Sequence, residues 1–336
     1  MASRGLRDIG VERYRSHNAD HGDKRMTADV KPRGVGVIGS GPFSRFVLER
    51  LSVRQDFVAV AWCCTSDYAN WSIQGRDCVI HTSVQDVIDD PRSELIYFDG
   101  EVSFELIARA IQCRKHVILP PISRLSSQEL RQLAQMAADQ GIIVVVDEPC
   151  RWDDDFTCAK SVFDGGQLGR PERIRLSIHE QSLPGEAFSQ GILRELGCHW
   201  LDQLLTFVPD KTFRAHLRTF RRSSQAVDDG FLATVEFGDG TSAVIELQIR
   251  SVLSLRTGWL LEGSLGAYRA GRLYTRTADG EIIDEPVSRP ITGNDPFFDG
   301  LSAEIQGATS TVSSLPDLTH VARVMELIEE LEESNE

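Results

Sequence analysis

Long hydrophobic runs are missing from this sequence: apolar runs such as 141–146 fall far short of the roughly 20 apolar residues that cross a membrane. An excess of positive charge is missing too, because 50 Asp and Glu against 36 Lys and Arg give a formal net charge of −14. No basic stripe interleaved with aromatic residues occurs. The charge therefore argues against partners such as nucleic acids and anionic membrane surfaces.

Cysteine pairs of the Cys-x-x-Cys type and Cys/His clusters with zinc-finger spacing are also absent, so no metal site is predicted. The seven cysteines are odd in number, which favours reduced, mostly buried thiols in a cytoplasmic protein. No local signature marks any of them as a catalytic nucleophile.

The first 32 residues have no apolar periodicity and lack the hydrophobic region of a signal peptide. We predict that 1–32 is a disordered tail. Because Met26 lies just before the first apolar segment, a gene start that is assigned too early is an alternative explanation.

A glycine turn follows the first apolar segment, which is rich in β-branched residues and predicts a buried strand. The turn is Gly39-Ser40-Gly41, and a helical pattern starts with Pro42 and Phe43. A strand, a glycine turn and a helix N-terminus together form a common pyrophosphate site, because free backbone N–H groups face the anion. These five residues are therefore predicted to bind a dinucleotide, although the motif alone also occurs in ordinary strand–helix turns.

Strand and helix patterns then alternate through the first half of the chain. Buried strands are predicted at 57–62, 78–81, 94–98, 116–119 and 142–147, and helices at 84–88, 103–113 and 128–140. The alternation predicts an α/β fold with a doubly wound parallel sheet. We therefore predict an NAD(P)-binding, Rossmann-like domain at 33–150.

The pattern changes after Cys150. Helices are predicted at 154–164, 191–207 and 318–331, with strands near 259–262, 267–274 and 281–285 and a hairpin across Gly238-Asp239-Gly240. This predicts an α+β domain at 151–336, built on a mostly antiparallel open sheet. A sheet with one face uncovered often pairs with a second copy, so we expect a homo-oligomer.

The helical segment 191–205 carries candidate catalytic residues. Glu195, His199 and Asp202 fall within about 60° of one another, opposite an apolar stripe. A carboxylate one turn from an imidazole can hold it charged or oriented, so Glu195 and His199 are candidates for acid–base chemistry. A solvated helix face with an incidental ion pair is the structural alternative.

Five blocks of sequence can be taken together: GVGVIGSG, DDPRSELIYF, ARAIQCRKHVILPPISRLSSQELRQLAQMAADQGIIVVVDEPCRWDDDF, GQLGRPERIR and GILRELGCHWLD. From about Arg33 onward, the chain resembles the glucose–fructose oxidoreductase / inositol dehydrogenase family (Gfo/Idh/MocA). The resemblance implies hydride transfer between NAD or NADP and a sugar, polyol or related hydroxyl compound. The family's catalytic groups are a Lys in a Glu-Lys-Pro motif and an Asp and a His spaced Asp-x-x-x-His.

Carried over to this sequence, the catalytic motif is altered. Pro121 stands at the lysine position, and proline can donate neither a proton nor a hydrogen bond. Glu195 stands at the Asp position, and His199 and Asp202 match the His and the Asp that follows it.

The resemblance also places cofactor residues at the ends of two strands. Trp62 stands where an acidic residue usually holds the adenine ribose, and no nearby Arg indicates a 2′-phosphate site. Asp99 and Gly100 form the turn expected near the nicotinamide, with Glu101 next to them. NAD and NADP therefore both remain possible cofactors.

Three functions are compatible with the sequence. The first is an NAD(P)-dependent oxidoreductase with a degraded catalytic motif, in which His199 is the acid or base and Glu195 tunes it. The second is a catalytically inactive homologue that binds a nucleotide, a ligand or a partner. The third is non-redox chemistry that uses Glu195, His199 and Glu148.

Overall fold

The computed structural model describes residues 31–39, 42–64, 78–100, 102–121, 124–180, 191–208, 212–221, 228–249, 251–290, 295–307 and 315–335. The chain divides into two compact units. The described residues of the first unit come from Tyr14–Glu148 and Thr292–Ala322, and those of the second from Pro149–Ile291 and Arg323–Glu336. Nearly all of the tail predicted at 1–32 lies outside the described residues, as do Ser40, Gly41 and Glu101.

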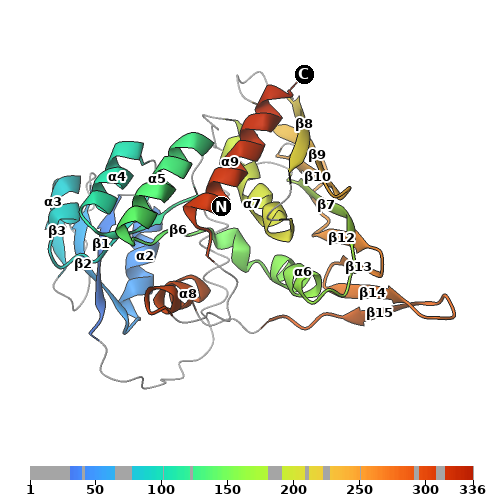
Figure 1. Cartoon of the computed structure of the whole chain (residues 1–336), viewed down its shortest axis with the longest axis horizontal. Coiled ribbons are helices and arrows are strands. Elements are labelled where there is room, and N and C mark those ends of the chain that lie inside the picture. Colours follow the sequence, from blue (N-terminus) through green and yellow to red (C-terminus); the bar gives the residue numbers. More distant parts are fainter. Residues whose placement is uncertain are drawn as a thin grey trace. The chain divides into compact units, whose positions relative to one another are not determined.

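The first unit is built on a six-stranded parallel sheet (Figure 1). Its strands are β1 (Arg33–Ile38), β2 (Phe57–Cys63), β3 (Val79–His81), β4 (Leu95–Phe98), β5 (His116–Leu119) and β6 (Val144–Val146). Its helices are α2 (Pro42–Ser52), α3 (Val84–Asp89), α4 (Phe104–Gln112), α5 (Ser127–Gln140) and α8 (Pro296–Ile305). The strand order is β3-β2-β1-β4-β5-β6, and Figure 1 shows α3, α4 and α5 on one face and α2 and α8 on the other. The predicted doubly wound parallel sheet is confirmed.

Local signals set the ends of the helices in this unit. Ser126 is the N-cap of α5: its hydroxyl accepts from the N–H of Glu129, whose carboxylate accepts from the N–H of Ser126. Such a capping box satisfies two N–H groups that the helix leaves unpaired. Gly141 ends the same helix in the left-handed region, at φ 64°. Ser83 caps α3, as the sequence predicts.

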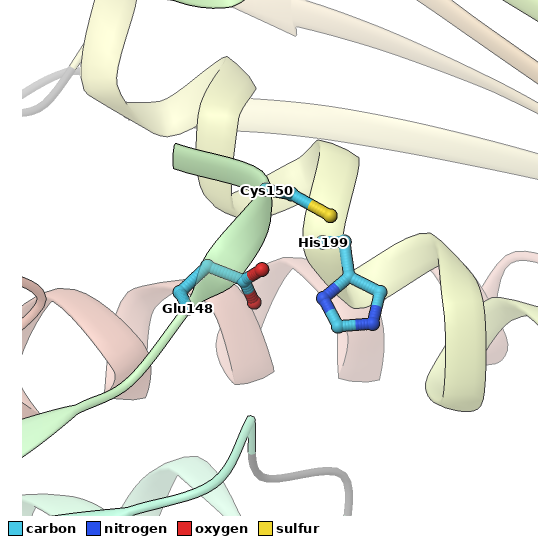
Figure 2. A group of neighbouring side chains, drawn as sticks. All are labelled: Glu148, Cys150 and His199. Carbon is cyan, nitrogen blue, oxygen red and sulfur yellow. The ribbon is translucent and has the colours of Figure 1, made fainter. Parts of the chain in front are cut away.

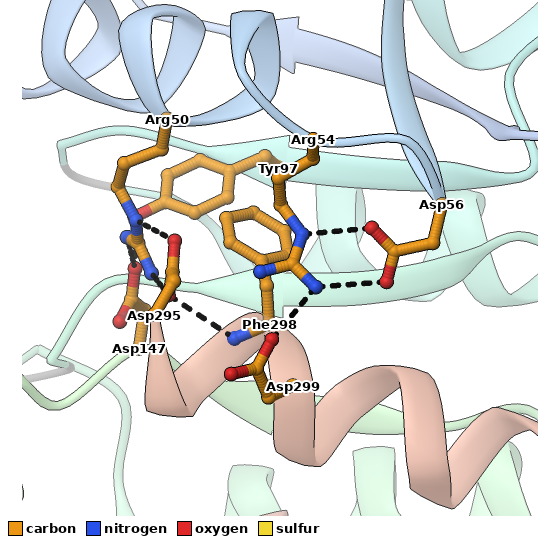
Figure 3. Close-up of polar contacts among 8 residues, drawn as sticks. All are labelled: Arg50, Arg54, Asp56, Tyr97, Asp147, Asp295, Phe298 and Asp299. Carbon is orange, nitrogen blue, oxygen red and sulfur yellow. Dashed lines mark hydrogen bonds and ion pairs between the residues drawn. The ribbon is translucent and has the colours of Figure 1, made fainter. Parts of the chain in front are cut away.

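The helix α8 was not predicted, and it is joined to the other elements of the first unit through a buried arginine of α2 (Figure 3). The side chain of Arg50 is 3% exposed and donates to Asp147 at 2.6 Å and to Asp295 at 2.8 and 2.9 Å. Its guanidinium carbon lies 4.6 Å from the ring centre of Phe298. A cation, two carboxylates and an aromatic ring thus join α8 to α2.

The two carboxylates of this cluster respond differently to burial. Burial raises the pKa of Asp147, against the opposing charge of Arg50. Burial acts in the same direction on Asp295, but the charge and hydrogen bonds of Arg50, with a further contribution from Arg54, lower its pKa overall. The shared cation Arg50 therefore outweighs the effect of burial on the pKa of Asp295 but not on the pKa of Asp147.

The second unit is built on a nine-stranded sheet (Figure 1). Its strands are β7 (Pro171–His179), β8 (Phe213–Phe220), β9 (Gly230–Phe237), β10 (Ser242–Gln248), β11 (Leu255–Arg256), β12 (Leu260–Gly263), β13 (Gly266–Arg269), β14 (Arg272–Arg276) and β15 (Ile282–Pro286). The order is β15-β14-β13-β12-β7-β10-β9-β8, with β11 paired to β7. Among the pairings that the structure describes within this second sheet, only the β7–β10 ladder is parallel. The prediction of a mostly antiparallel second sheet is confirmed.

The helices of the second unit include η2 (Pro149–Trp152), α6 (Asp154–Asp164), the π-helical turn η3 (Leu193–Gly197), α7 (Cys198–Phe207) and the later part of α9 (Leu318–Glu333). The predicted hairpin across residues 238–240 joins β9 and β10. The single strand predicted at 267–274 is wrong, because β13 and β14 are separate strands. Ala270 and Gly271 both have positive φ, 50° and 75°, and turn the chain back within that range.

No helix among the described residues is long and apolar enough to span a membrane. All seven cysteines lie in the described parts of the chain, where none of them forms a disulfide; three are buried and four partly exposed.

Candidate functional site

The turn between β1 and α2 begins at a position that only glycine can occupy. Gly39 has a φ of 149°, and a Cβ there would lie 2.6 Å from Cβ of Asp99 and 2.7 Å from Oγ of Ser44. Real Cβ contacts do not come so close, and the backbone conformation also disfavours a side chain. The structure thus supplies a physical reason for the first glycine of the predicted dinucleotide motif.

A carboxylate of the same unit lies at the N-terminus of α2. Oδ2 of Asp99 accepts hydrogen bonds from the backbone N–H and the hydroxyl of Ser44, at 2.7 and 2.5 Å. Pro42, the first residue of α2, has no N–H to offer. Because helix N-termini attract anions, Asp99 supplies a negative charge from within the protein where a pyrophosphate is expected.

Trp62 lies at the other side of the same turn. Its side chain is buried, with the residue 3% exposed, and its indole N–H donates to the carbonyl oxygen of Gly39 at 3.0 Å. Indole has no acceptor, so Trp62 cannot take the ribose hydroxyl protons that a carboxylate at this position accepts. The hydrogen bond from Trp62 instead stabilises the backbone of the turn at Gly39.

The remaining predicted cofactor residues are described in part. Gly100 has a φ of 89°, and no atom lies within 4 Å of a Cβ added there. A side chain at this position would therefore meet no steric clash, but the backbone conformation would be strained. Pro42 and Phe43 belong to the first turn of α2. Ser40 and Gly41, in the middle of the turn, are outside the described residues.

The predicted catalytic segment is helical, but its first turn is not an α-helix. Residues Leu193–Gly197 form the π turn η3, in which hydrogen bonds span one residue more than in an α-helix. The regular α-helical spacing expected through Glu195 therefore does not apply in this turn. A Cβ on Gly197 would lie 2.9 Å from the ring of Phe231, so this glycine allows the π turn to approach β9.

Asp202 is a partner of an arginine in the preceding segment. Both of its carboxylate oxygens accept hydrogen bonds from Arg151, at 2.7 and 2.9 Å, and the two side chains are 7% and 3% exposed. Bidentate pairs of this kind fix geometry as well as charge. Asp202 therefore attaches η2 to α7.

Gln203 makes a second attachment between the same elements. Its amide nitrogen donates to the carbonyl oxygen of Cys150, and its amide oxygen accepts from the indole N–H of Trp259 at 2.9 Å. Gln203 is 1% exposed, so both contacts are shielded from water. The carbonyl oxygen of Cys150 and the side chain of Arg151 thus both attach η2 to α7.

Three potential metal ligands lie together at this junction (Figure 2). Glu148, Cys150 and His199 each offer one ligand atom, and these atoms lie within 4.8 Å of one another. Glu148 is buried and is joined to Cys150 through one proline, so the local chain sets the placement of this pair. Figure 2 shows the three side chains pointing toward one another, with His199 extending from α7.

The sequence predicts only part of this group of three residues. It makes His199 a candidate acid or base and Glu148 a residue of the non-redox alternative, but it does not single out Cys150 and predicts no metal site. The pair Glu148-x-Cys150 has no recognised metal spacing, and the third ligand comes from a distant helix. Only the tertiary fold brings the three together.

Comparisons with known proteins agree with this architecture. Residues 156–269 match the GFO/IDH/MocA C-terminal domain. The chain is 25% identical over 277 residues to the scyllo-inositol 2-dehydrogenase (NADP(+)) IolW of Bacillus subtilis, covering 75% of this chain and 74% of that one. It is also 25% identical over 249 residues to the uncharacterized oxidoreductase YdgJ of Escherichia coli, with 70% of each chain covered.

A solved structure gives the same fold. An NAD-binding protein from Listeria innocua superposes with a TM-score of 0.76 at 18% sequence identity, over 91% of this chain and 95% of that one. At such low identity the likeness establishes the fold alone. Together with the matched C-terminal domain, the relatives confirm the resemblance of this chain to the GFO/IDH/MocA family that is seen in the sequence.

Proposed function

We propose that this protein is an oxidoreductase that uses NAD or NADP to oxidise or reduce a sugar, a polyol or a similar hydroxyl compound. The strand order β3-β2-β1-β4-β5-β6, with the turn at Gly39 where the order reverses, carries the proposal. This is the order of dinucleotide-binding sheets, which hold the pyrophosphate at the helix that follows β1. The named activity of the Bacillus subtilis relative supports the substrate class.

The cofactor would be held by residues around this turn. The backbone at Gly39 permits close approach of a ligand, whereas the carboxylate of Asp99 opposes a diphosphate. We therefore expect weaker dinucleotide binding than a turn without this acid would give. The residues proposed to surround the cofactor are Gly39, Ser40, Gly41, Pro42, Phe43, Trp62, Asp99 and Gly100.

His199 is the proposed acid or base. When bound, the nicotinamide would accept or donate the hydride. In the oxidation direction the hydride leaves the hydroxyl-bearing carbon, and the hydroxyl proton passes to the neutral imidazole of His199. Glu195 would stabilise the resulting imidazolium, and Asp202 would position α7 through Arg151. Pro121 supplies no cation where the family has lysine, so a lower rate is expected.

Titration of the protein with NADH and NADPH, followed by nicotinamide fluorescence, tests the cofactor first. Saturable binding of one of them below millimolar concentration is expected. Turnover with inositols and related polyols is then measured for wild type, His199→Ala and the control His216→Ala, which removes an exposed histidine of β8. His199→Ala is expected to keep cofactor affinity and to lower turnover by about 100-fold or more. Unchanged turnover would remove His199 from the mechanism.

A second candidate is a catalytically inactive homologue, and the contact between Asp99 and Ser44 favours it. With the anion-attracting end of α2 already facing a carboxylate, the fold could persist without any dinucleotide. The same titration separates the two candidates. Absence of NADH and NADPH binding would favour the second one and end the oxidoreductase proposal.

We further propose that the protein is a cytoplasmic homo-oligomer. Seven cysteines that form no disulfide among the described residues suit a reducing compartment. Several large apolar side chains of the second unit are exposed, among them Val252 at 86%, Leu253 at 70% and Leu265 at 67%. A second copy would remove such surface from water. Light scattering coupled to size exclusion would give the mass in solution, and a monomer at every concentration would contradict this part of the proposal.

A further inference from the structure

We propose that Glu148, Cys150 and His199 form a binding site for a thiophilic divalent cation, with zinc as the expected ion. The three residues offer a carboxylate oxygen, a thiolate sulfur and an imidazole nitrogen, and these atoms lie within 4.8 Å of one another (Figure 2). Donors bound tetrahedrally to one zinc ion at about 2.0–2.3 Å lie roughly 3.3–3.7 Å apart. Side-chain rotations that move the ligand atoms by about 1 Å would therefore complete the site.

The types of ligand select the class of metal. Calcium and magnesium prefer an all-oxygen environment, and they gain little from a thiolate or an imidazole. Zinc binds sulfur, nitrogen and oxygen donors in tetrahedral sites, and a mixed set of Cys, His and Glu satisfies all three preferences. The site is therefore expected to discriminate strongly against magnesium.

The surrounding contacts hold the ligands in place. The bidentate pair between Arg151 and Asp202 and the hydrogen bond from Gln203 to the carbonyl of Cys150 fix the η2 segment on α7, which carries His199. Such outer contacts keep a metal site preorganised, because the ligands then lose little freedom on binding. The attachment of η2 to α7 thus serves the cation site directly.

Three protein ligands leave the fourth position of a tetrahedral zinc ion open, as in catalytic zinc sites. This consequence rests on the proposed function: a substrate hydroxyl at the open position would become more acidic, and the ion would supply the positive charge that is missing at Pro121. In the metal-bound protein His199 is a ligand, and it cannot at the same time accept the substrate proton. The metal-bound and metal-free proteins therefore differ in how the hydroxyl proton is removed.

Cobalt(II) titration of the purified full-length chain tests the site without cofactor or substrate. One equivalent is expected to bind and to produce the near-ultraviolet absorption of a cobalt–thiolate bond, which zinc then abolishes by competition. Cys150→Ser should eliminate this absorption, whereas the control Cys113→Ser should retain it. Glu148→Gln and His199→Ala should weaken cobalt binding at least about tenfold, which is the cost of losing even an outer partner of a metal site.

The proposal is overturned if cobalt and zinc fail to bind below millimolar concentration, or if Cys150→Ser leaves the thiolate absorption unchanged. Because His199→Ala could disturb α7, circular dichroism and the melting temperature are recorded for every variant. If cobalt and zinc do not bind, the result of the nicotinamide titration still stands, and His199 can act as acid or base. Conversely, failure of NADH and NADPH binding leaves the cobalt result interpretable.

Discussion

The two ends of α2 differ in how the charged side chains next to them are paired. At the N-terminal end, one carboxylate, Asp99, accepts from the backbone and hydroxyl of Ser44. At the C-terminal end, the cation Arg50 lies between Asp147 and Asp295, and nearly all of the cluster is buried. The N-terminal end of α2 has a single carboxylate next to a proposed ligand site. The C-terminal end has a cation that is paired with carboxylates of the same unit.

The difference indicates which end can change its partner. If Asp99 moved away from Ser44, the backbone N–H and the hydroxyl of Ser44 could donate to another anion. Replacing one anion with another at this end therefore costs little free energy. Removing either acid from Arg50 would leave a buried charge uncompensated, which is far more expensive. The C-terminal end is therefore expected to stabilise the fold, and the N-terminal end to control ligand binding.

Replacement of Arg50 should have the largest effect. Arg50→Met leaves Asp147 and Asp295 buried without their cation, and we expect the free energy of unfolding to fall by about 3–5 kcal/mol. Urea denaturation followed by circular dichroism measures the change. The control is Arg45→Met on the same helix, whose arginine is 59% exposed and pairs with Glu49 at 3.5 Å; a change within about 0.5 kcal/mol is expected. Equal losses in both variants would contradict the contrast.

Replacement of Asp99 should have an intermediate effect, with opposite signs for stability and binding. Asp99→Asn removes the charge but keeps the shape, so unfolding should become easier by about 1 kcal/mol. The dissociation constant for NADH or NADPH should fall about tenfold, equivalent to about 1.4 kcal/mol. Nicotinamide fluorescence measures the affinity. The control Asp86→Asn removes an exposed acid from the first turn of α3 and should change neither quantity. Unchanged affinity in Asp99→Asn would show that this acid does not face the dinucleotide.

The acid–arginine pair of Asp90 and Arg92, outside α2, should give the smallest effect and a distinct pH dependence. The hydrogen bonds of Arg92, against an opposing contribution from burial, lower the pKa of Asp90 to about 2. A lowered carboxyl pKa stabilises the fold above the unfolded value of about 3.9, and the contribution is lost as the pH falls toward 2. Asp90→Asn should therefore cost about 1 kcal/mol or less at neutral pH, with the difference shrinking between about pH 4 and pH 2. Urea titrations across that range provide the test, and a pH-independent difference would refute this ionic origin.

Sequence periodicity predicted most of the fold because its determinants are local. Ser126, Glu129 and Gly141 mark the two ends of α5, and β5 was predicted at its observed limits. The turn at Ala270 and Gly271 was missed because it interrupts a continuous apolar alternation. The helix α8 was missed although Asp295 and Pro296 are local signals for a helix start, whereas its contact with Arg50, 245 residues away, has no local signal.

The candidate site was less predictable for the same reason. Gly39 and His199 were identifiable from motifs, but the pairing of Ser44 with Asp99 joins residues 55 positions apart. The π turn before α7 depends on close packing of Gly197 against Phe231, which no helical periodicity reveals. Motifs thus indicated the type of site, whereas its contacts depended on the tertiary fold.

The return of α8 to the first sheet also determines when this protein can finish folding during synthesis. The strands β1 to β6 leave the ribosome early, but Asp295 follows Arg50 by 245 residues. Until then Arg50 has Asp147 but lacks the two hydrogen bonds to Asp295, and the surface that Phe298 covers is exposed to water. Nascent chains arrested before residue 295 are therefore the species most at risk of aggregation and most in need of a chaperone.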